Sequence, residues 1–428
     1  MLSLDTSADF NNQPHHAIST TIQLPLDVIH YLIEAIDVHG GDFRADEEDR
    51  RSLLAACSLV CRAWNDICRH VIFRKISFKK RFFLISRLCF FRDKARHLTQ
   101  YVKEADISFE NDFNLSVPRI HGWLSECFDR FENLTVLHLV NHEDGYCICY
   151  GEVYSGILHL LTNARLREFY LHHWVFQTPD CLLSLLECSC PTTLESLSLK
   201  NIKMMVRGSP SIGPAHLEEL RNLEVYDYKD IFYGPGQVIV CPNLKTCSVN
   251  DWPFPSWIAT SRLSKLTLCN VTPSRAIPVF KRAICPFELV IKMTVDPESR
   301  EYSTWIANCL NSIPAPDHLR QLSLHIRFCI SETDPLHFPD YAPLSRVLHR
   351  FYKNHKVERI QINVELDFCA VIAWMFSASV GSAEVARLED AFELSLKEGV
   401  LSIEFTIRGY SPGRGEGTFM RSRIERKS

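Results

Sequence analysis

The sequence predicts an α/β protein, in which a small N-terminal module of three helices is followed by an irregular solenoid of helices and strands. Three observations lead to this fold class. Apolar residues recur at helical spacing early in the chain, short Leu-rich segments with strand-like alternation recur later, and helical patterns lie between many of these segments. The 428 residues are 46% hydrophobic and 23% charged, an ordinary globular balance with room for two or three units.

The helical module is predicted over residues 22–78, after a polar and aperiodic leader over residues 1–21 that we expect to be flexible. In "LPLDVIHYLIEAI", Pro25 suits a first helical turn, and the apolar residues that follow fall on one helical face: Ile29, Leu32, Ile33 and Ile36. The Gly-containing, mixed-charge segment "HGGDFRADEEDRR" is expected to be a solvated loop. A second helix is predicted over residues 53–61, and a third continues it past Trp64.

A helical transition is predicted over residues 79–130. A repeated pattern of Leu-rich segments then covers residues 131–410. Its segments follow the pattern Leu-x-x-Leu-x-Leu or a close variant, and they begin at Leu134, Leu166, Leu194, Leu223, Leu244, Leu263, Leu319 and Val357. Each ends with the alternation of a half-buried strand, and a last strand is predicted at "VLSIEFTI". Helical patterns such as "DCLLSLLEC" and "LSRVLHRFY" lie between them.

These segments resemble leucine-rich repeats, because most of their spacings fall near the period of about 20–29 residues. The resemblance implies a curved parallel sheet, in which each unit buries its leucines against the next. The repeats are irregular, since Asn141, Asn201 and Asn270 come one place earlier than the asparagine of a regular repeat. An unrelated helix-and-sheet domain is the alternative. The Gly-rich and then basic residues 411–428 are expected to form a disordered tail.

Composition excludes several classes of function. The net charge of −4 comes without a concentrated basic face, which argues against nucleic acid as the main partner. The 17 cysteines show no disulfide framework, and the N-terminus does not have the pattern of a secretory signal, so we expect a reducing compartment, cytoplasmic or nuclear or both. The longest apolar stretch, residues 369–380, is too short for a membrane span, and no membrane association is expected.

The sequence offers little evidence for a catalytic site or a metal site. Cys57 and Cys61 lie four residues apart, but a second close pair for a structural zinc site is not evident. The pairs Cys147/Cys149 and Cys188/Cys190 do not have the two-residue gap of a zinc knuckle. The pair His15/His16 lies in the expected flexible leader and His172/His173 at a strand end beside Trp174, so surface or packing roles are expected for them. The sequence contains no nucleophile elbow, phosphate-binding P-loop or zincin motif. We therefore predict a non-catalytic protein without a cofactor or metal, and keep a hydrolase or metal enzyme as a third-ranked alternative.

The N-terminal module resembles the F-box. The residues that carry the resemblance are a Leu-Pro pair that opens the first helix, two isoleucines within it, a Val-Cys-Arg-x-Trp turn and an apolar step into a strand, here Leu24, Pro25, Ile29, Ile33, Val60, Cys61, Arg62, Trp64, Ile72 and Phe73. The match covers about one eighth of the chain. It departs from the family in the long insertion between the first two helices, and the loose repeats with an acidic loop look similar to the expanded F-box families of fungi.

The F-box resemblance implies binding to a Skp-family adaptor, which bridges to a cullin and a RING protein in an SCF ubiquitin ligase. It assigns the adaptor contact to Leu24, Pro25, Ile29, Leu59, Val60, Cys61 and Trp64. The repeat region would then bind a protein substrate that the sequence does not identify. An F-box protein that acts with the adaptor outside a cullin ligase, as a scaffold, is the second reading. The size of the module supports a partner surface independently, because three short helices cannot bury all of these apolar residues.

Overall fold

The computed structural model describes residues 25–39, 46–78, 89–108, 130–141, 147–149, 151–188, 192–206, 208, 210–227, 238–250, 258–259, 263–271, 286–295, 301–313, 316–330, 340–368, 373–411 and 415–424. The chain divides into two compact units, residues 1–74 and residues 75–428. We call them the helical unit and the sheet unit and describe each by itself.

Three α-helices form the described part of the helical unit, α1 (Leu26–His39), α2 (Asp46–Ser58) and α3 (Arg62–Ile72). Helix α1 begins directly after Pro25, whose carbonyl accepts hydrogen bonds from the backbone N–H groups of Val28 and Ile29 at 3.1 and 3.2 Å. The structure differs from the prediction in two places. Helix α2 begins at Asp46, inside the expected loop, and the unit ends at Arg74 because Lys75–Phe78 is the first strand of the sheet.

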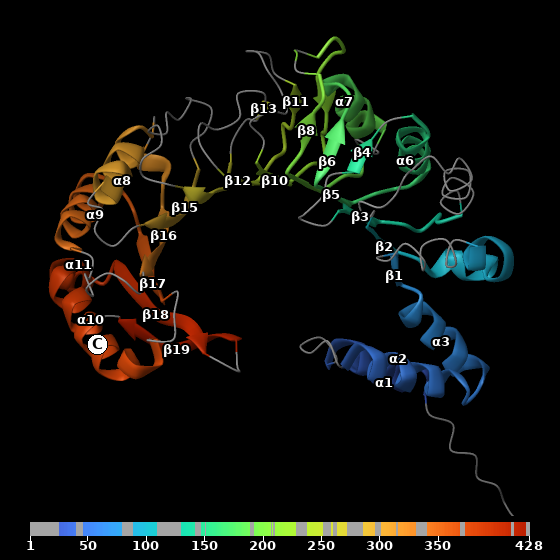
Figure 1. Ribbon diagram of the computed structural model, residues 1–428, viewed down its shortest axis with the longest axis horizontal. Coiled ribbons are helices and arrows are strands. Elements are labelled where there is room, and N and C mark those ends of the chain that lie inside the picture. The colour runs from blue at the N-terminus through green and yellow to red at the C-terminus, as the bar shows by residue number, and fades with distance from the viewer. Residues whose placement is uncertain are drawn as a thin grey trace, which may run out of the picture. The chain divides into compact units, whose positions relative to one another are not determined.

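The sheet unit is built on one large, mostly parallel sheet (Figure 1). Within the described residues its strand order is β1-β2-β3-β5-β7-β10-β12-β14-β15-β16-β17-β18-β19. The early strands are short: β1 (Lys75–Phe78), β2 (Glu104–Ile107), β3 (Val136–Val140), β5 (Glu168–His172), β7 (Ser196–Lys200), β10 (Asn222–Tyr226) and β12 (Thr246–Asn250). The later strands are longer: β14 (Lys265–Val271), β15 (Glu288–Val295), β16 (Gln321–Ile330), β17 (Arg359–Phe368), β18 (Leu401–Ser411) and β19 (Gly415–Ile424). All neighbours pair in parallel except β18 and β19.

Two small parallel sheets accompany the large one. One has the order β4-β6-β8, with β4 (Cys147–Cys149), β6 (Trp174–Phe176) and β8 (Lys203–Met204). The other has the order β13-β11-β9, with β9 (Ala215–His216), β11 (Ile239–Val240) and β13 (Ile258–Ala259). Each of these strands lies in a connection between two strands of the large sheet. The connections that hold β8, β9, β11 and β13 contain no helix among the described residues, whereas those that hold β4 and β6 each also contain a helix.

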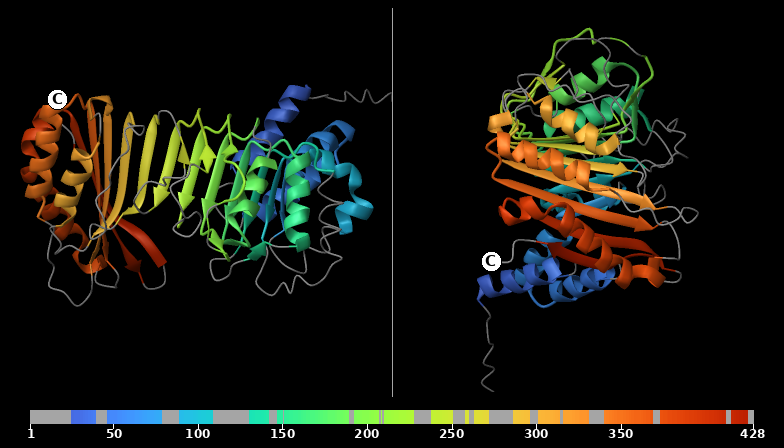
Figure 2. Two further views of the ribbon diagram at one scale, coloured as in Figure 1. Left: turned by 90° about the horizontal axis from the view of Figure 1, so that it is seen from above. Right: turned by 90° about the vertical axis from the view of Figure 1, so that its left-hand side faces the viewer.

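Helices lie in the connection between β1 and β2, in those between β3 and β7, where they accompany β4 and β6, and in those between β15 and β18. They are α6 (Gly151–Asn163), α7 (Pro179–Cys188), α8 (Glu301–Asn311), α9 (Ala342–Asn354), α10 (Ala373–Ala391) and α11 (Glu393–Lys397), with η1 (Phe90–Lys94), η2 (Arg96–Tyr101) and η3 (Pro316–His318) as shorter turns. Helices α8 to α11 lie on one side of strands β15 to β18, and the opposite face of these strands carries no helix among the described residues (Figures 1 and 2). Among the described segments, no helix is both long and apolar enough to cross a membrane.

Alternating side chains explain this arrangement. In β3, for example, Leu137 and Leu139 are buried, and the residues between and beside them are half-buried. The same alternation recurs in β5, β16 and β17. Because successive side chains of a strand point to opposite faces, the buried set packs beneath the connecting helices and the other set forms an open, polar face. We call the second set the polar face.

Polar residues turn the chain where three strands of the large sheet end. His173, Asn201 and Asp227 directly follow β5, β7 and β10, and each has a positive φ, of 63°, 52° and 53°. Asn, Asp and His tolerate this left-handed region better than other non-glycine residues. The Nδ2 atom of Asn141 donates to the His173 carbonyl at 3.1 Å, which links neighbouring turns. Asn250 contacts Asp227 in the same way, from its Nδ2 atom to the Asp227 carboxylate at 2.8 Å.

The structure confirms the mixed α/β class and the alternation of helix and strand. Each predicted segment from Leu134 to "VLSIEFTI" contributes a strand to the large sheet. Strand β1 directly follows the apolar step into a strand at Ile72 and Phe73, whereas β2, β15 and the strands of the two small sheets were not predicted. The tail prediction is wrong for residues 415–424, which form β19 and pair with β18. This strand belongs to the sheet despite its glycines, because it completes the backbone hydrogen bonds of β18.

Candidate functional site

The helical unit has a small core made by all three helices. The buried members are Ile29, Ile33, Leu54, Ile67 and Cys68, and the partly buried Cys57, Trp64, Val71 and Ile72 pack against them. Ile29 and Ile33 are four residues apart in α1, so they present one face to the other two helices. The core is therefore filled by one stripe of each helix.

The same unit exposes an unusual amount of apolar surface. Seven of the twelve large hydrophobic side chains that are exposed among the described residues belong to it: Leu26, Val28, Tyr31, Leu32, Leu53, Leu59 and Val60. Leu59 and Val60 are 86% and 64% exposed, and they occupy the turn between α2 and α3. A small unit that exposes this many large apolar side chains has apolar area for a partner to cover. We call these seven side chains the apolar surface.

The predicted adaptor contacts fall into two groups. Pro25, Leu59, Val60 and Cys61 are exposed and available to a partner. Ile29 is 5% exposed and Trp64 is half-buried against the core. These two residues support the surface from beneath. Leu24 lies outside the described residues.

Five side chains of this surface were not among the predicted contacts: Leu26, Val28, Tyr31, Leu32 and Leu53. Leu32 was expected on the inner face of α1, but it is 41% exposed, because it lies one residue before Ile33 and therefore about 100° around the helix. Tyr31 and Leu53 are exposed as well, at 72% and 50%. A stricter reading of the i, i+4 spacing of Ile29 and Ile33 would have placed Tyr31 and Leu32 outside the core.

Cys68 of the helical unit is not placed to act as a reactive thiol. Cys68 is buried in the core, and burial raises the pKa of its thiol, with a smaller contribution from the nearby Cys57. A thiol with a raised pKa is a poor nucleophile and a poor metal ligand at neutral pH. Within the part of the chain that the structure describes, no group of three or more potential ligand side chains is placed to hold a metal ion.

The second candidate site is the polar face of the sheet. Strand register aligns six side chains of successive strands in one row, which we call the central row: Asp106, His138, Tyr170, Ser198, Glu224 and Ser248. The rings of His138 and Tyr170 stack with centroids 4.2 Å apart and planes 4° apart. The row therefore combines aromatic rings, hydroxyl groups and carboxylates on a rigid scaffold.

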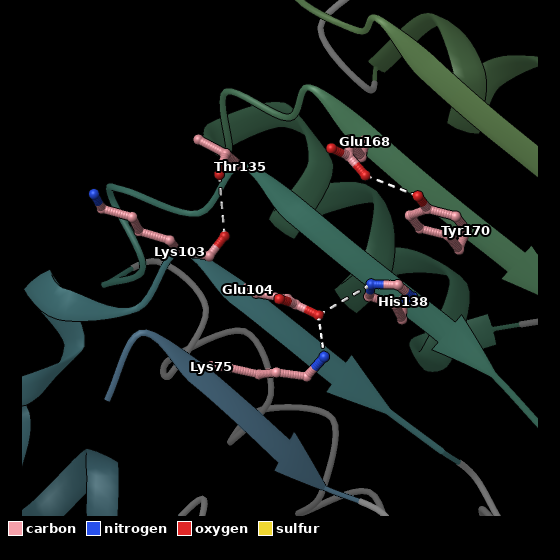
Figure 3. Close-up of polar contacts among 7 residues, drawn as sticks. All are labelled: Lys75, Lys103, Glu104, Thr135, His138, Glu168 and Tyr170. Carbon is pink, nitrogen blue, oxygen red and sulfur yellow. Dashed lines mark hydrogen bonds and ion pairs between the residues drawn. The ribbon is translucent and has the colours of Figure 1, made fainter. Parts of the chain in front are cut away.

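Ion pairs and hydrogen bonds fix the first part of this face (Figure 3). Glu104 Oε1 lies 2.5 Å from Lys75 Nζ and 3.3 Å from His138 Nε2. The Tyr170 hydroxyl donates to Glu168 Oε2 at 2.8 Å. Burial raises the pKa of Tyr170 to about 12, with the Glu168 carboxylate contributing, so the phenol is neutral at physiological pH.

The histidines of the face are neutral too. Burial lowers the pKa of His138, and the carboxylate of Glu104 opposes this shift without reversing it. Burial lowers the pKa of His172 to about 4, and the positive charge of Lys200 adds to the effect. Both imidazoles can therefore donate and accept hydrogen bonds at neutral pH but carry no charge.

A serine, a histidine and a glutamate meet on strands β5, β7 and β10. His172 Nε2 lies 3.0 Å from Ser198 Oγ, and that hydroxyl lies 3.3 Å from Glu224 Oε2. In a hydrolytic triad the histidine stands between the serine and the acid, and the serine is accessible. Here the serine stands between the other two and is 3% exposed. The contact is better explained as a hydrogen-bond network that orders the face.

The later strands carry charges that are paired with one another. The guanidinium of Arg327 on β16 contacts both Asp367 and Glu365 on β17, and Arg408 on β18 lies 3.4 Å from the same Glu365. Lys265 and Glu288 form a further pair at 2.7 Å between β14 and β15. This half of the polar face therefore satisfies much of its own charge.

The sequence matches no protein-family model and is similar to no curated protein at a significant level. The residues and their geometry carry the functional argument.

Proposed function

We propose that this protein is a substrate receptor of an SCF-type ubiquitin ligase, in which the helical unit binds a Skp-family adaptor and the sheet unit binds a protein substrate. Ubiquitin transfer would be accelerated by proximity, because the receptor holds the substrate beside the cullin and RING subunits that the adaptor recruits. The chain itself would perform no chemistry.

The apolar surface of the helical unit is the observation that carries this proposal. Leu59 and Val60 lie at the position of the F-box-like Val-Cys-Arg-x-Trp turn and are more exposed than most apolar residues of the chain. A protein that leaves such side chains in water gains stability when a partner removes them from it, at about 25 cal/mol for each Å² of apolar area. The sequence resemblance and the exposure therefore point to the same residues.

The sheet unit supports the second half of the proposal. Its polar face is formed by side chains of many parallel strands, which are held in fixed register by the backbone. A rigid face of this kind orders its side chains before binding, so a partner does not have to offset their conformational entropy.

A binding experiment with purified proteins tests the adaptor contact. The full chain is mixed with a Skp-family adaptor, and the complex is measured by size-exclusion chromatography and calorimetry. We expect a one-to-one complex, and we expect the double substitution Leu59→Asp and Val60→Asp to weaken it at least about thirtyfold, as the loss of about 2 kcal/mol at an interface hot spot predicts. The melting temperature should be unchanged, since both side chains are exposed.

A matched control uses another exposed apolar pair. Met205 and Val206 are 59% and 56% exposed and lie in the sheet unit. The double substitution Met205→Asp and Val206→Asp should leave the complex intact. The proposal is wrong if the adaptor does not bind, or if the two double variants weaken binding equally. Addition of a cullin then separates the ligase from an adaptor-bound scaffold, because only the ligase forms a ternary complex.

A further inference from the structure

We propose that the central row of the polar face binds an arginine side chain of the partner protein, with Glu224 as the residue that pairs with the guanidinium. This inference rests on the proposed function, because it names the chemistry by which the sheet unit recognises its substrate. Four features of the described residues support it.

The first feature is the net charge of the polar face on strands β1 to β12, which we call the early half of the face. The carboxylates of strands β2, β5 and β10 on it are Glu104, Asp106, Glu168 and Glu224, and the cations of strands β1 and β7 are Lys75 and Lys200. Lys75 is paired with Glu104. Because the two histidines of the same face are neutral, they do not offset the remaining negative charge. The surface is therefore complementary to a cation.

The second feature is the accessibility of Glu224. It is exposed, and the hydrogen bond that Ser198 donates to it is long, at 3.3 Å. Its register partners on the adjacent strands are the serines at positions 198 and 248. Serine side chains are short, so neither neighbour covers the carboxylate, and an incoming donor can approach it from above the sheet.

The third feature is the aromatic setting. Tyr226 follows Glu224 by two residues on the same strand and therefore points to the same face. Tyr170 occupies the same row two strands away. The negative charge of Glu224 contributes to the raised pKa of both phenols, which shows that both lie within electrostatic range of it. A planar guanidinium can stack on such a ring while it forms two hydrogen bonds with a carboxylate.

The fourth feature is the contrast with the later strands. Arg327 and Lys265 there already contact carboxylates of the same face, Asp367 and Glu288, and Lys292 and Arg359 add further positive charge to that face. An incoming cation meets paired charges on that half and an exposed carboxylate on this one. We therefore place the arginine on β5, β7 and β10 and not on β14 to β18.

Lys200 is the residue that opposes this inference. It lies in the next row, in register with Tyr226 on β10 and His172 on β5. Its single charge offsets one carboxylate, and the half-face stays negative. Lys200 also predicts the position of the partner's arginine, which should lie toward Tyr170 and away from the lysine.

Selection from a random peptide library tests the inference. A phage-displayed library is panned on the immobilised full chain, on Glu224→Gln and on Glu288→Gln, which removes a carboxylate that is paired with Lys265. We expect arginine to be enriched in peptides selected by the wild type and by Glu288→Gln, and not in those selected by Glu224→Gln. Equal enrichment by Glu224→Gln, no enrichment, or no selected peptide at all would overturn the inference.

A second measurement separates the guanidinium from charge alone. The best peptide is synthesised with its arginine, with lysine and with neutral citrulline in the same place. We expect lysine and citrulline each to raise the Kd about tenfold or more, as the loss of a charge-assisted hydrogen bond predicts. A lysine peptide that binds equally well would overturn the assignment of arginine.

Adaptor binding by the same protein preparation keeps the two proposals distinct. A protein that binds the adaptor but shows no preference for arginine leaves the ligase proposal standing and removes this inference. A protein that selects arginine but does not bind the adaptor does the reverse. The melting temperature of Glu224→Gln should equal that of the wild type, because the substituted side chain is exposed.

Discussion

The apolar surface of the helical unit and the polar face of the sheet unit differ in how they would bind a partner. The first consists of large exposed hydrophobic side chains on three short helices, and Leu59 is its most exposed member. The second consists of carboxylates, hydroxyl groups and aromatic rings on parallel strands, in which few large hydrophobic side chains are exposed. Affinity for the first surface would come from desolvation, which is non-directional and weakly dependent on salt. Affinity for the second would depend on charge and geometry.

This difference suits two kinds of partner. A surface of exposed leucine and valine costs free energy while it faces water, so it suits a partner that stays bound. A polar face is stable in water without a ligand, so it suits a partner that binds and leaves. Raising the NaCl concentration should therefore weaken peptide binding by the sheet unit and leave adaptor binding nearly unchanged.

The largest expected effect is a loss of stability, and it distinguishes core residues of the helical unit from surface residues. Ile33 is fully buried in that core, and Ile33→Ala should lower the free energy of unfolding of the unit by about 2–5 kcal/mol and reduce adaptor binding with it. Leu59→Ala should leave the stability nearly unchanged and reduce adaptor binding directly. Urea denaturation of the full chain, followed beside adaptor titration, measures both. If Leu59→Ala destabilised the chain as much as Ile33→Ala does, Leu59 would be a core residue and not a contact.

The next largest effect is a loss of stability at acidic pH that originates from His172 on the polar face. The pKa of His172 is lowered from 6.5 to about 4, mainly by burial. Above pH 6.5 the imidazole is neutral in both the folded and the unfolded chain, and the stability is fully present. As the pH falls from 6.5 toward 4, the unfolded chain takes up a proton that the folded chain does not, and the stability falls by at most about 3 kcal/mol.

Urea denaturation at pH 7.5 and pH 5 measures this loss. The variant His172→Gln should lose less stability over the same interval than the wild type, because glutamine does not titrate. The stacked pair of His138 and Tyr170 is present in both proteins, so the difference in stability loss reports His172. An equal loss in both proteins would show that His172 is as accessible to protons as an ordinary surface histidine.

The smallest expected effect is the loss of stability on removing an ion pair between the later strands of the sheet. Arg327 is 46% exposed and contacts Asp367 and Glu365. Arg327→Ala should lower the stability by about 1 kcal/mol or less, and by less still at high salt, because solvent screens exposed ion pairs. A double-mutant cycle with Asp367→Ala isolates the pair. A coupling free energy well above that value would mean that this half of the face is more rigid than its exposure indicates.

Local patterns predicted most of the fold. Segments such as "LREFYL" predict a strand because apolar and polar residues alternate, and that segment forms β5. The sequence "FELVIKMTV" around β15 does not fit the Leu-x-x-Leu-x-Leu pattern, and its apolar run is buried on both faces at Val290 and Ile291. Strand β19 was not predicted, because its Gly-rich sequence lacks a strand pattern. It forms by antiparallel pairing with the edge strand β18, a long-range contact that a local pattern does not show.

Of the two candidate sites, one could be predicted from the sequence and the other could not. Leu59 and Val60 could be predicted, because a contiguous motif carries them and their turn lies between two helices. The network of His172, Ser198 and Glu224 could not be, because it joins three strands that are 26 residues apart in sequence. Their contact depends on the register of β5, β7 and β10, which long-range backbone hydrogen bonds set.

Affinity purification from cells with the proteasome blocked tests most directly whether the two surfaces bind different partners. The full chain is compared with its variant Leu59→Asp, Val60→Asp. We predict that the wild type retains the adaptor, cullin and RING subunits together with further proteins, and that the variant loses the three ligase subunits and retains the further proteins. A variant that keeps the adaptor, or that loses every partner at once while it stays folded, would contradict the account.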